Sequence, residues 1–90
     1  MVVVVLPYSS YDHHLISDPE IVTRGFIYVK EAEELMEELK RVAVESCDSC
    51  AAQHIMDWTA IKNRVKNNVS GYLYKTTRRS PMILPVITEI

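Results

Sequence analysis

Cys47 and Cys50 form a Cys-x-x-Cys pair, and His54 follows four residues after the second cysteine. This spacing suits either dithiol redox chemistry or half of a zinc site, but a structural zinc needs four ligands and the sequence has no other cysteine. The pair also falls near the end of an expected helix, whereas reactive thiols favour helix N-termini. We interpret the two residues as buried or half-buried structural thiols. A small redox or metal module is the alternative.

The rest of the sequence offers little catalytic chemistry. His13 and His14 are adjacent, so on a strand their side chains point to opposite faces and do not readily share a metal. There is no Ser-His-Asp grouping with supporting context and no His-x-His-x-Asp-His motif. A glycine-rich phosphate loop is also absent, because Gly25 and Gly71 are the only glycines. We therefore expect no catalytic residue, metal or cofactor in this segment.

Basic residues gather in the last third of the chain. Residues 1–56 carry ten acidic and four basic side chains, and residues 57–90 carry two acidic and six basic ones. Together with an expected outward tyrosine, the basic residues suit the backbone and bases of RNA. The alternative is a solvated helix face whose long side chains cover the core. The candidate RNA-binding residues are Lys62, Arg64, Lys66, Tyr74, Lys75, Arg78 and Arg79.

The apolar pattern predicts the elements that position these residues. Two extended segments, two helices with apolar positions at i, i+3, i+4 and i+7, and a last strand follow one another. We expect an α+β domain over residues 1–90, with a three-stranded sheet packed on two helices in the order β-β-α-α-β. A split of the second strand around Pro19 is left open. The expected elements are strands at 2–8, 21–29 and 81–90, and helices from Lys30 to about Cys50 and from Trp58 to about Thr76, with Asp57 as N-cap.

Both faces of the first and last strands are apolar, although two helices cover only one face of a sheet. The uncovered face would be an apolar patch on the order of several hundred Å². We expect it to pack against a second copy or against other domains of a longer protein; burial by the chain's own loops is the alternative. Prolines 81 and 85 place the last strand at an edge and the first strand in the middle. The candidate interface residues are Val3, Val5, Ile83, Pro85, Ile87 and Arg24.

Composition limits the setting. The net charge is −2, and the longest apolar run, Val2 to Leu6, is far too short for a membrane span. No charged segment precedes that run and no cleavage site follows it, so we do not expect it to be a signal peptide. A sequence that opens on "MVVVV" is typical of a strand cut from a longer protein. Two thiols make no disulfide framework, and we expect a cytoplasmic location and no membrane partner.

Three motifs in series resemble a known family. Arg-Gly-Phe-x-Tyr lies at 24–28, Asp-Trp at 57–58 and Pro-Met-Ile-Leu-Pro-Val-Ile at 81–87. In order and spacing they are similar to the C-terminal domain of ribonuclease J, which belongs to the metallo-β-lactamase/β-CASP nucleases. The resemblance covers nearly the whole chain. The segments "SSYDHH" and "CDSCAAQHIM" depart from the family pattern, and both lie in expected connections.

The resemblance implies a parent enzyme that processes and degrades RNA as an endonuclease and 5′-to-3′ exonuclease, with zinc bound in a different domain. It implies that this segment is a non-catalytic accessory domain, which supports self-association and full activity. Gly25 is expected to allow a bulge between the second strand and the first helix. Arg24 beside it either pairs with a nearby acid or carbonyl or contacts a partner. An RNA-binding accessory module is the alternative function.

Overall fold

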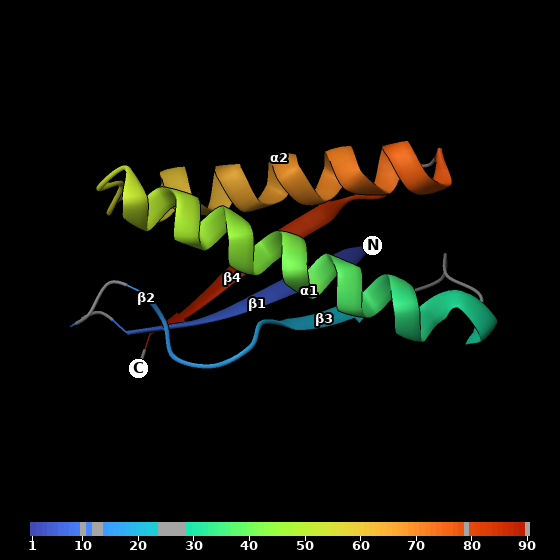
Figure 1. Cartoon of the computed structure of the whole chain (residues 1–90), viewed down its shortest axis with the longest axis horizontal. Coiled ribbons are helices and arrows are strands. Elements are labelled where there is room, and N and C mark those ends of the chain that lie inside the picture. Colours follow the sequence, from blue (N-terminus) through green and yellow to red (C-terminus); the bar gives the residue numbers. More distant parts are fainter. Residues whose placement is uncertain (10, 12–13, 24–28, 79, 90) are drawn as a thin grey trace.

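The computed structural model describes residues 1–9, 11, 14–23, 29–78 and 80–89. Both helices lie side by side on one face of the sheet (Figure 1). The predicted α+β class and the order β-β-α-α-β are confirmed, and the second strand is divided around Pro19, the split that the sequence left open. The elements are β1 (Val2–Ser9), β2 (His14–Leu15), β3 (Glu20–Thr23), α1 (Val29–Ala52), α2 (Trp58–Thr77) and β4 (Ile83–Glu89).

The first strand is the centre of the sheet, as predicted. Strand β4 runs parallel to β1 from the Val2–Ile83 pair to the Tyr8–Glu89 pair. Strands β3 and β2 both pair antiparallel with β1, near its start and its end respectively. Because β4 occupies one edge of β1 along its whole length, β2 and β3 share the other edge. The sheet is therefore three strands wide, with β4 at an edge.

The core lies between β1 and the helices. Side chains of β1 alternate, and the four that face the helices (Val2, Val4, Leu6 and Tyr8) are all buried. The Tyr8 ring meets Trp58 at the start of α2 edge to face, with ring centroids 5.4 Å apart. The helices add two stripes at helical spacing: Leu39, Ala43, Cys47 and Cys50 from α1, and Ile61, Val65, Val69 and Leu73 from α2.

Each helix ends on a left-handed residue that is not glycine. His54 has φ 57°, and the backbone N–H groups of His54 and Ile55 donate to the carbonyls of Ala51 and Cys50 in a Schellman pattern. Arg78 has φ 60°, and its N–H donates to the Tyr74 carbonyl. At the other end of α2, Asp57 is the N-cap residue, but its side chain makes no capping hydrogen bond.

No helix within the described residues is both long and apolar enough to cross a membrane.

Candidate protein interface on the open face of the sheet

The face of the sheet turned away from the helices is lined by two rows of side chains. Strand pairing places Val22, Val3 and Leu84 in the first row and Glu20, Val5 and Val86 in the second. Paired residues of neighbouring strands share a face, so each row crosses the whole sheet. Five of these six side chains are apolar. We call Val3, Val5, Val22, Leu84 and Val86 the open-face cluster.

The open-face cluster is exposed at its two edges. Val22, Leu84 and Val86 keep 40%, 46% and 38% of their surface accessible, whereas the helix-facing residues Ile21 and Ile83 keep 8% and 4%. Val3 and Val5, in the central strand, are half-buried between their neighbours. Apolar area left in water favours association, because each Å² removed from water contributes about 25 cal/mol. The arrangement is suited to packing against another protein surface.

The placement of the β4 residues corrects one prediction. Ile83, Pro85 and Ile87 were expected on the open face, but they lie in register with Val2, Val4 and Leu6, whose side chains are buried against the helices. The outward positions of β4 are Leu84 and Val86. The sequence is apolar at every position from 82 to 87, so alternation alone gave no orientation; the register with β1 fixes it. Arg24 and Gly25 lie outside the described residues.

The predicted RNA-binding residues do not form a single patch. The Arg64 guanidinium donates to Ser49 Oγ at 2.8 Å and to Gln53 Oε1 at 3.0 Å, so it bridges α2 to α1. By helical spacing, Lys62 and Lys66 lie on the opposite flank of the buried stripe. Tyr74, Lys75 and Arg78 gather at the C-terminal end of α2, where the Arg78 guanidinium lies 5.8 Å from the centroid of the Tyr74 ring. Arg79 lies outside the described residues.

The cysteine pair is buried and free. Cys47 and Cys50 are 2% and 0% exposed. Burial raises the pKa of the Cys47 thiol to about 11, although a hydrogen bond with the Tyr8 side chain partly offsets this effect. A thiol with so high a pKa is a poor nucleophile at neutral pH. His54, the nearby histidine considered as a third ligand, lies exposed at the end of α1.

Zinc does not fit this part of the chain. Among the residues that the structure describes, no group of three or more His, Cys, Asp or Glu side chains is placed to hold a metal ion. A structural zinc needs four such ligands and a catalytic zinc needs three. The described side chains therefore do not supply the ligands of a zinc site.

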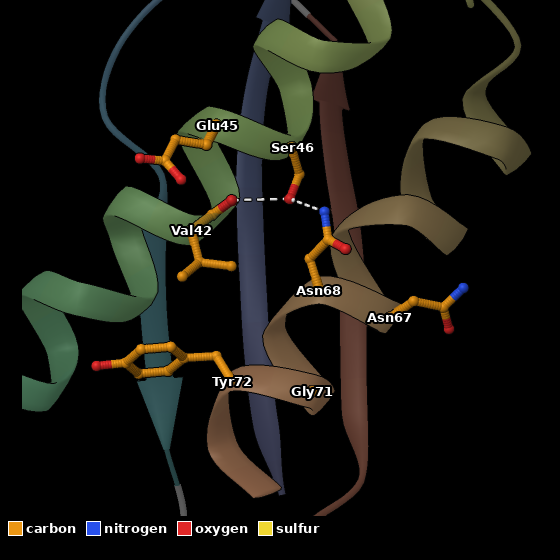
Figure 2. A pocket seen from close by; sticks show the side chains of 7 residues that line it. All are labelled: Val42, Glu45, Ser46, Asn67, Asn68, Gly71 and Tyr72. Atoms are coloured by element: carbon orange, nitrogen blue, oxygen red, sulfur yellow. Dashed lines mark hydrogen bonds between the residues drawn. The ribbon is translucent and has the colours of Figure 1, made fainter. Parts of the chain in front are cut away.

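A polar contact between the helices was missed from the sequence. Ser46 is 1% exposed; its hydroxyl donates to the Val42 carbonyl and accepts from the Asn68 amide (Figure 2). Next to this contact, the helices border a cleft of about 380 Å³ that also touches Gly71 and Tyr72. The sequence does carry a signal for this contact. A serine stands at a core-facing position of one helix, and the other helix has neighbouring asparagines that can bond to it.

Comparison with known proteins identifies similar chains. The ribonuclease J C-terminal domain family matches residues 1–90. Ribonuclease J2 of Bacillus subtilis is 32% identical over 90 residues, which cover 100% of this chain and 16% of the relative. Ribonuclease J 2 of Staphylococcus aureus is 33% identical over 88 residues, which cover 98% of this chain and 16% of the relative. The chain thus spans about a sixth of the length of these relatives.

Proposed function

Because the chain belongs to the family of ribonuclease J C-terminal domains, we propose that it is a non-catalytic assembly domain whose open sheet face packs against a second copy of itself. The observation that carries the proposal is the open-face cluster, which has no covering element among the described residues. Both helices lie on the other face, and β2 and β3 pair edge to edge with β1. Within this part of the chain, nothing shields the cluster from water.

Two copies would bring their open faces together about a two-fold axis, so that each cluster covers the other. Sheets that pack face to face bury such side chains in a layer about 10 Å thick. Glu20 lies at the rim of the second row, on the edge strand β3, where a carboxylate can remain in water while the valines and leucine are covered. The association is then driven by apolar area, and salt should change it little.

The longer protein is proposed to be a ribonuclease that hydrolyses RNA, with zinc bound in a domain outside this chain. The names of the relatives and the share of their length that this chain covers support this proposal. In that setting the domain acts on catalysis indirectly, by holding copies of the enzyme together. Packing of the same face against another domain of the longer protein is the competing arrangement.

Sedimentation equilibrium of the 90-residue chain tests self-association. We expect a reversible dimer whose dissociation constant is nearly independent of salt. A chain that stays monomeric at the highest attainable concentration would contradict the proposal and favour packing against another domain. A dimer whose affinity falls steeply with salt would also contradict it, because that behaviour indicates a charged interface.

A further inference from the structure

The outer face of α2 is unusual for a solvent-exposed helix. The positions farthest from the core are uncharged: Asn63, Asn67, Ser70, Gly71 and Tyr74. The exposed Lys66 and Lys75 lie on the two flanks of this row. Asn, Ser and Gly are weaker helix formers than Ala, Lys or Glu. Helix stability therefore does not account for these residue types. An exposed aromatic ring such as Tyr74 is of a residue type enriched at binding surfaces.

Gly71 leaves an opening at the centre of this face. A Cβ atom placed on Gly71 would meet no heavy atom within 4 Å, so packing within the chain does not require glycine here. The residue borders the cleft of about 380 Å³ between α1 and α2. Figure 2 shows Tyr72 extending toward α1 below Val42, and Asn68 turned toward Ser46. The absence of a side chain at Gly71 allows a flat group to approach the helix backbone.

Basic side chains of α2 lie next to this opening, toward the C-terminal end of the helix. Helix α2 contains four basic residues and no acidic one between Trp58 and Thr77. Lys75 and Arg78 follow Gly71 by four and seven residues, so they lie on the same side of the helix one and two turns away. Glu45 also borders the cleft, and its carboxylate shares the Arg41 guanidinium with Glu38. The cations available to a phosphate are therefore those of α2.

A stacking surface lies beside these cations. Tyr74 keeps 52% of its surface accessible, and the Arg78 guanidinium is positioned over the ring, 5.8 Å from its centroid. Aromatic rings flanked by basic side chains bind single-stranded nucleic acid, because bases stack on the rings and phosphates meet the cations. The side-chain oxygen of Asn68 adds an acceptor near the cleft, since its hydrogen bond to Ser46 uses the Nδ2 group.

We propose that the C-terminal half of α2 binds single-stranded RNA. One base enters the cleft over Gly71 beside Asn68 and the adjacent base stacks on Tyr74. The phosphate that joins these two nucleotides and the next phosphate along the strand contact Lys75 and Arg78. This site lies on the helix layer, opposite the open-face cluster, so it does not depend on self-association. It excludes Arg64, whose guanidinium is held by Ser49 and Gln53, as well as Lys62 and Lys66 on the other flank.

Fluorescence anisotropy with a labelled oligouridylate of about twelve nucleotides tests the site. The double variant Lys75→Gln/Arg78→Gln should weaken binding by about tenfold or more and flatten the slope of log K against log salt by about 1.4, as expected for two lost phosphate contacts. The matched double variant Lys62→Gln/Lys66→Gln removes the same charge from the opposite flank. It should change the affinity by less than about threefold.

Gly71→Leu separates binding from folding. Leucine is a better helix former than glycine and has open space at this position, so the melting temperature should stay the same or rise. Affinity should nevertheless fall by about tenfold, equal to about 1.4 kcal/mol, because the leucine fills the opening. Thr59→Leu, at another exposed position near the start of α2, is the control and should bind like the unchanged chain.

Three results would overturn the proposal. The first is no anisotropy change up to about 100 µM protein at low salt, where even non-specific RNA binding is detected. The second is an equal loss of affinity in the two double variants, which would indicate diffuse attraction without a site. The third is a Gly71→Leu variant that binds RNA normally; if it also sediments differently, the cleft accommodates a protein instead.

Discussion

Asn68 and Ser46 join the two helices directly: the Asn68 amide donates to Ser46 Oγ at 2.8 Å, and the serine hydroxyl donates onward to the Val42 carbonyl at 2.7 Å. Ser46 is buried among apolar side chains, whereas Asn68 lies largely in water. The Asn68 amide of α2 therefore gives the buried Ser46 hydroxyl of α1 a hydrogen-bond donor. It fixes the two helices at the point where they border the cleft (Figure 2).

We expect Asn68→Ala to lower the free energy of unfolding by about 0.5–1.5 kcal/mol, the usual net contribution of one hydrogen bond. The loss stays modest because Ser46 keeps its bond to the Val42 carbonyl. Urea unfolding of the two single variants and of Ser46→Ala/Asn68→Ala together gives the coupling energy, which should be about 0.5 kcal/mol or more. Asn67→Ala, on the neighbouring position, is the control. Additive single effects would show that the two side chains do not interact.

Ile83 and Leu84 are neighbours in β4 that face opposite sides of the sheet. Ile83→Ala should lower the free energy of unfolding by about 2–4 kcal/mol, because it opens a cavity under the helices. Leu84→Ala should change the stability of the dilute monomer by less than about 1 kcal/mol, yet weaken self-association, because its side chain lies on the open face. Chemical unfolding and sedimentation of both variants measure these effects. The reverse pattern would contradict the register of β4.

Much of this fold follows from the sequence. The elements begin and end within about two residues of their predicted bounds, apart from the second strand. That strand was expected to reach Val29, but Val29 begins α1, and residues 24–28 are outside the described part. The central position of β1 and the edge position of β4 also follow, from the two prolines and the unbroken apolar run. The family resemblance drawn from three short motifs is confirmed over residues 1–90.

What could not be predicted depends on contacts between elements. Helical spacing placed Arg64 at the flank of the apolar stripe. It could not show that Ser49 of α1 and Gln53, just after that helix, hold the guanidinium. The orientation of β4 depends on its register with β1, which a run without alternation leaves open. Neither Ser46 nor Gly71 belongs to a sequence motif. That both border the cleft between α1 and α2 follows only from the packing of the two helices.

We expect the free energy of unfolding to fall at alkaline pH because of the buried Cys47 thiol. Burial, partly offset by the hydrogen bond with Tyr8, raises its pKa from the ordinary 9.0 to about 11. The folded state therefore holds the thiol proton more tightly than the unfolded state. The resulting stabilisation is fully present below about pH 9 and is lost as the pH rises to about 11, amounting to about 2–3 kcal/mol in all. Burial also raises the pKa of Tyr8, in the same direction.

Urea unfolding measured at intervals from neutral to alkaline pH checks this expectation. Cys47→Ala should flatten the decline between pH 9 and 11, even though it also costs some stability at neutral pH through the lost side-chain volume. Tyr8 accounts for the part of the slope that remains. An identical slope in the variant would mean that the thiol does not titrate in this range.

His54 occupies the left-handed position after α1, with φ 57°. Residues with a Cβ are strained in this region and glycine is not, so His54→Gly should raise the free energy of unfolding by about 0.5–1 kcal/mol. Ala51→Gly, three residues earlier within α1, should lower it by about 1 kcal/mol, because glycine there only adds freedom to the unfolded chain. Thermal unfolding distinguishes the two. Loss of stability in both would indicate that His54 makes a contact worth more than the strain.

Pro85 lies in β4, which is an edge strand of the sheet among the described residues. The Val2 N–H donates to the Met82 carbonyl, and backbone groups alternate along a strand. The backbone groups of the even-numbered residues of β4 therefore point to β1, and the backbone nitrogen of Pro85 points away from β1, to the outer edge of the sheet. Proline has no N–H to offer a further strand, which limits edge-to-edge pairing. We expect Pro85→Val to keep the thermal stability within about 1 kcal/mol but to promote β-rich aggregation of the concentrated chain.

Light scattering and thioflavin binding during incubation measure that aggregation. Pro81→Val, before the start of β4, is the matched control, because its position precedes the paired segment. It should aggregate no faster than the unchanged chain. If Pro85→Val also remained dispersed, something other than the missing N–H would protect the outer edge of β4. That result would contradict the role of Pro85 in limiting edge-to-edge pairing.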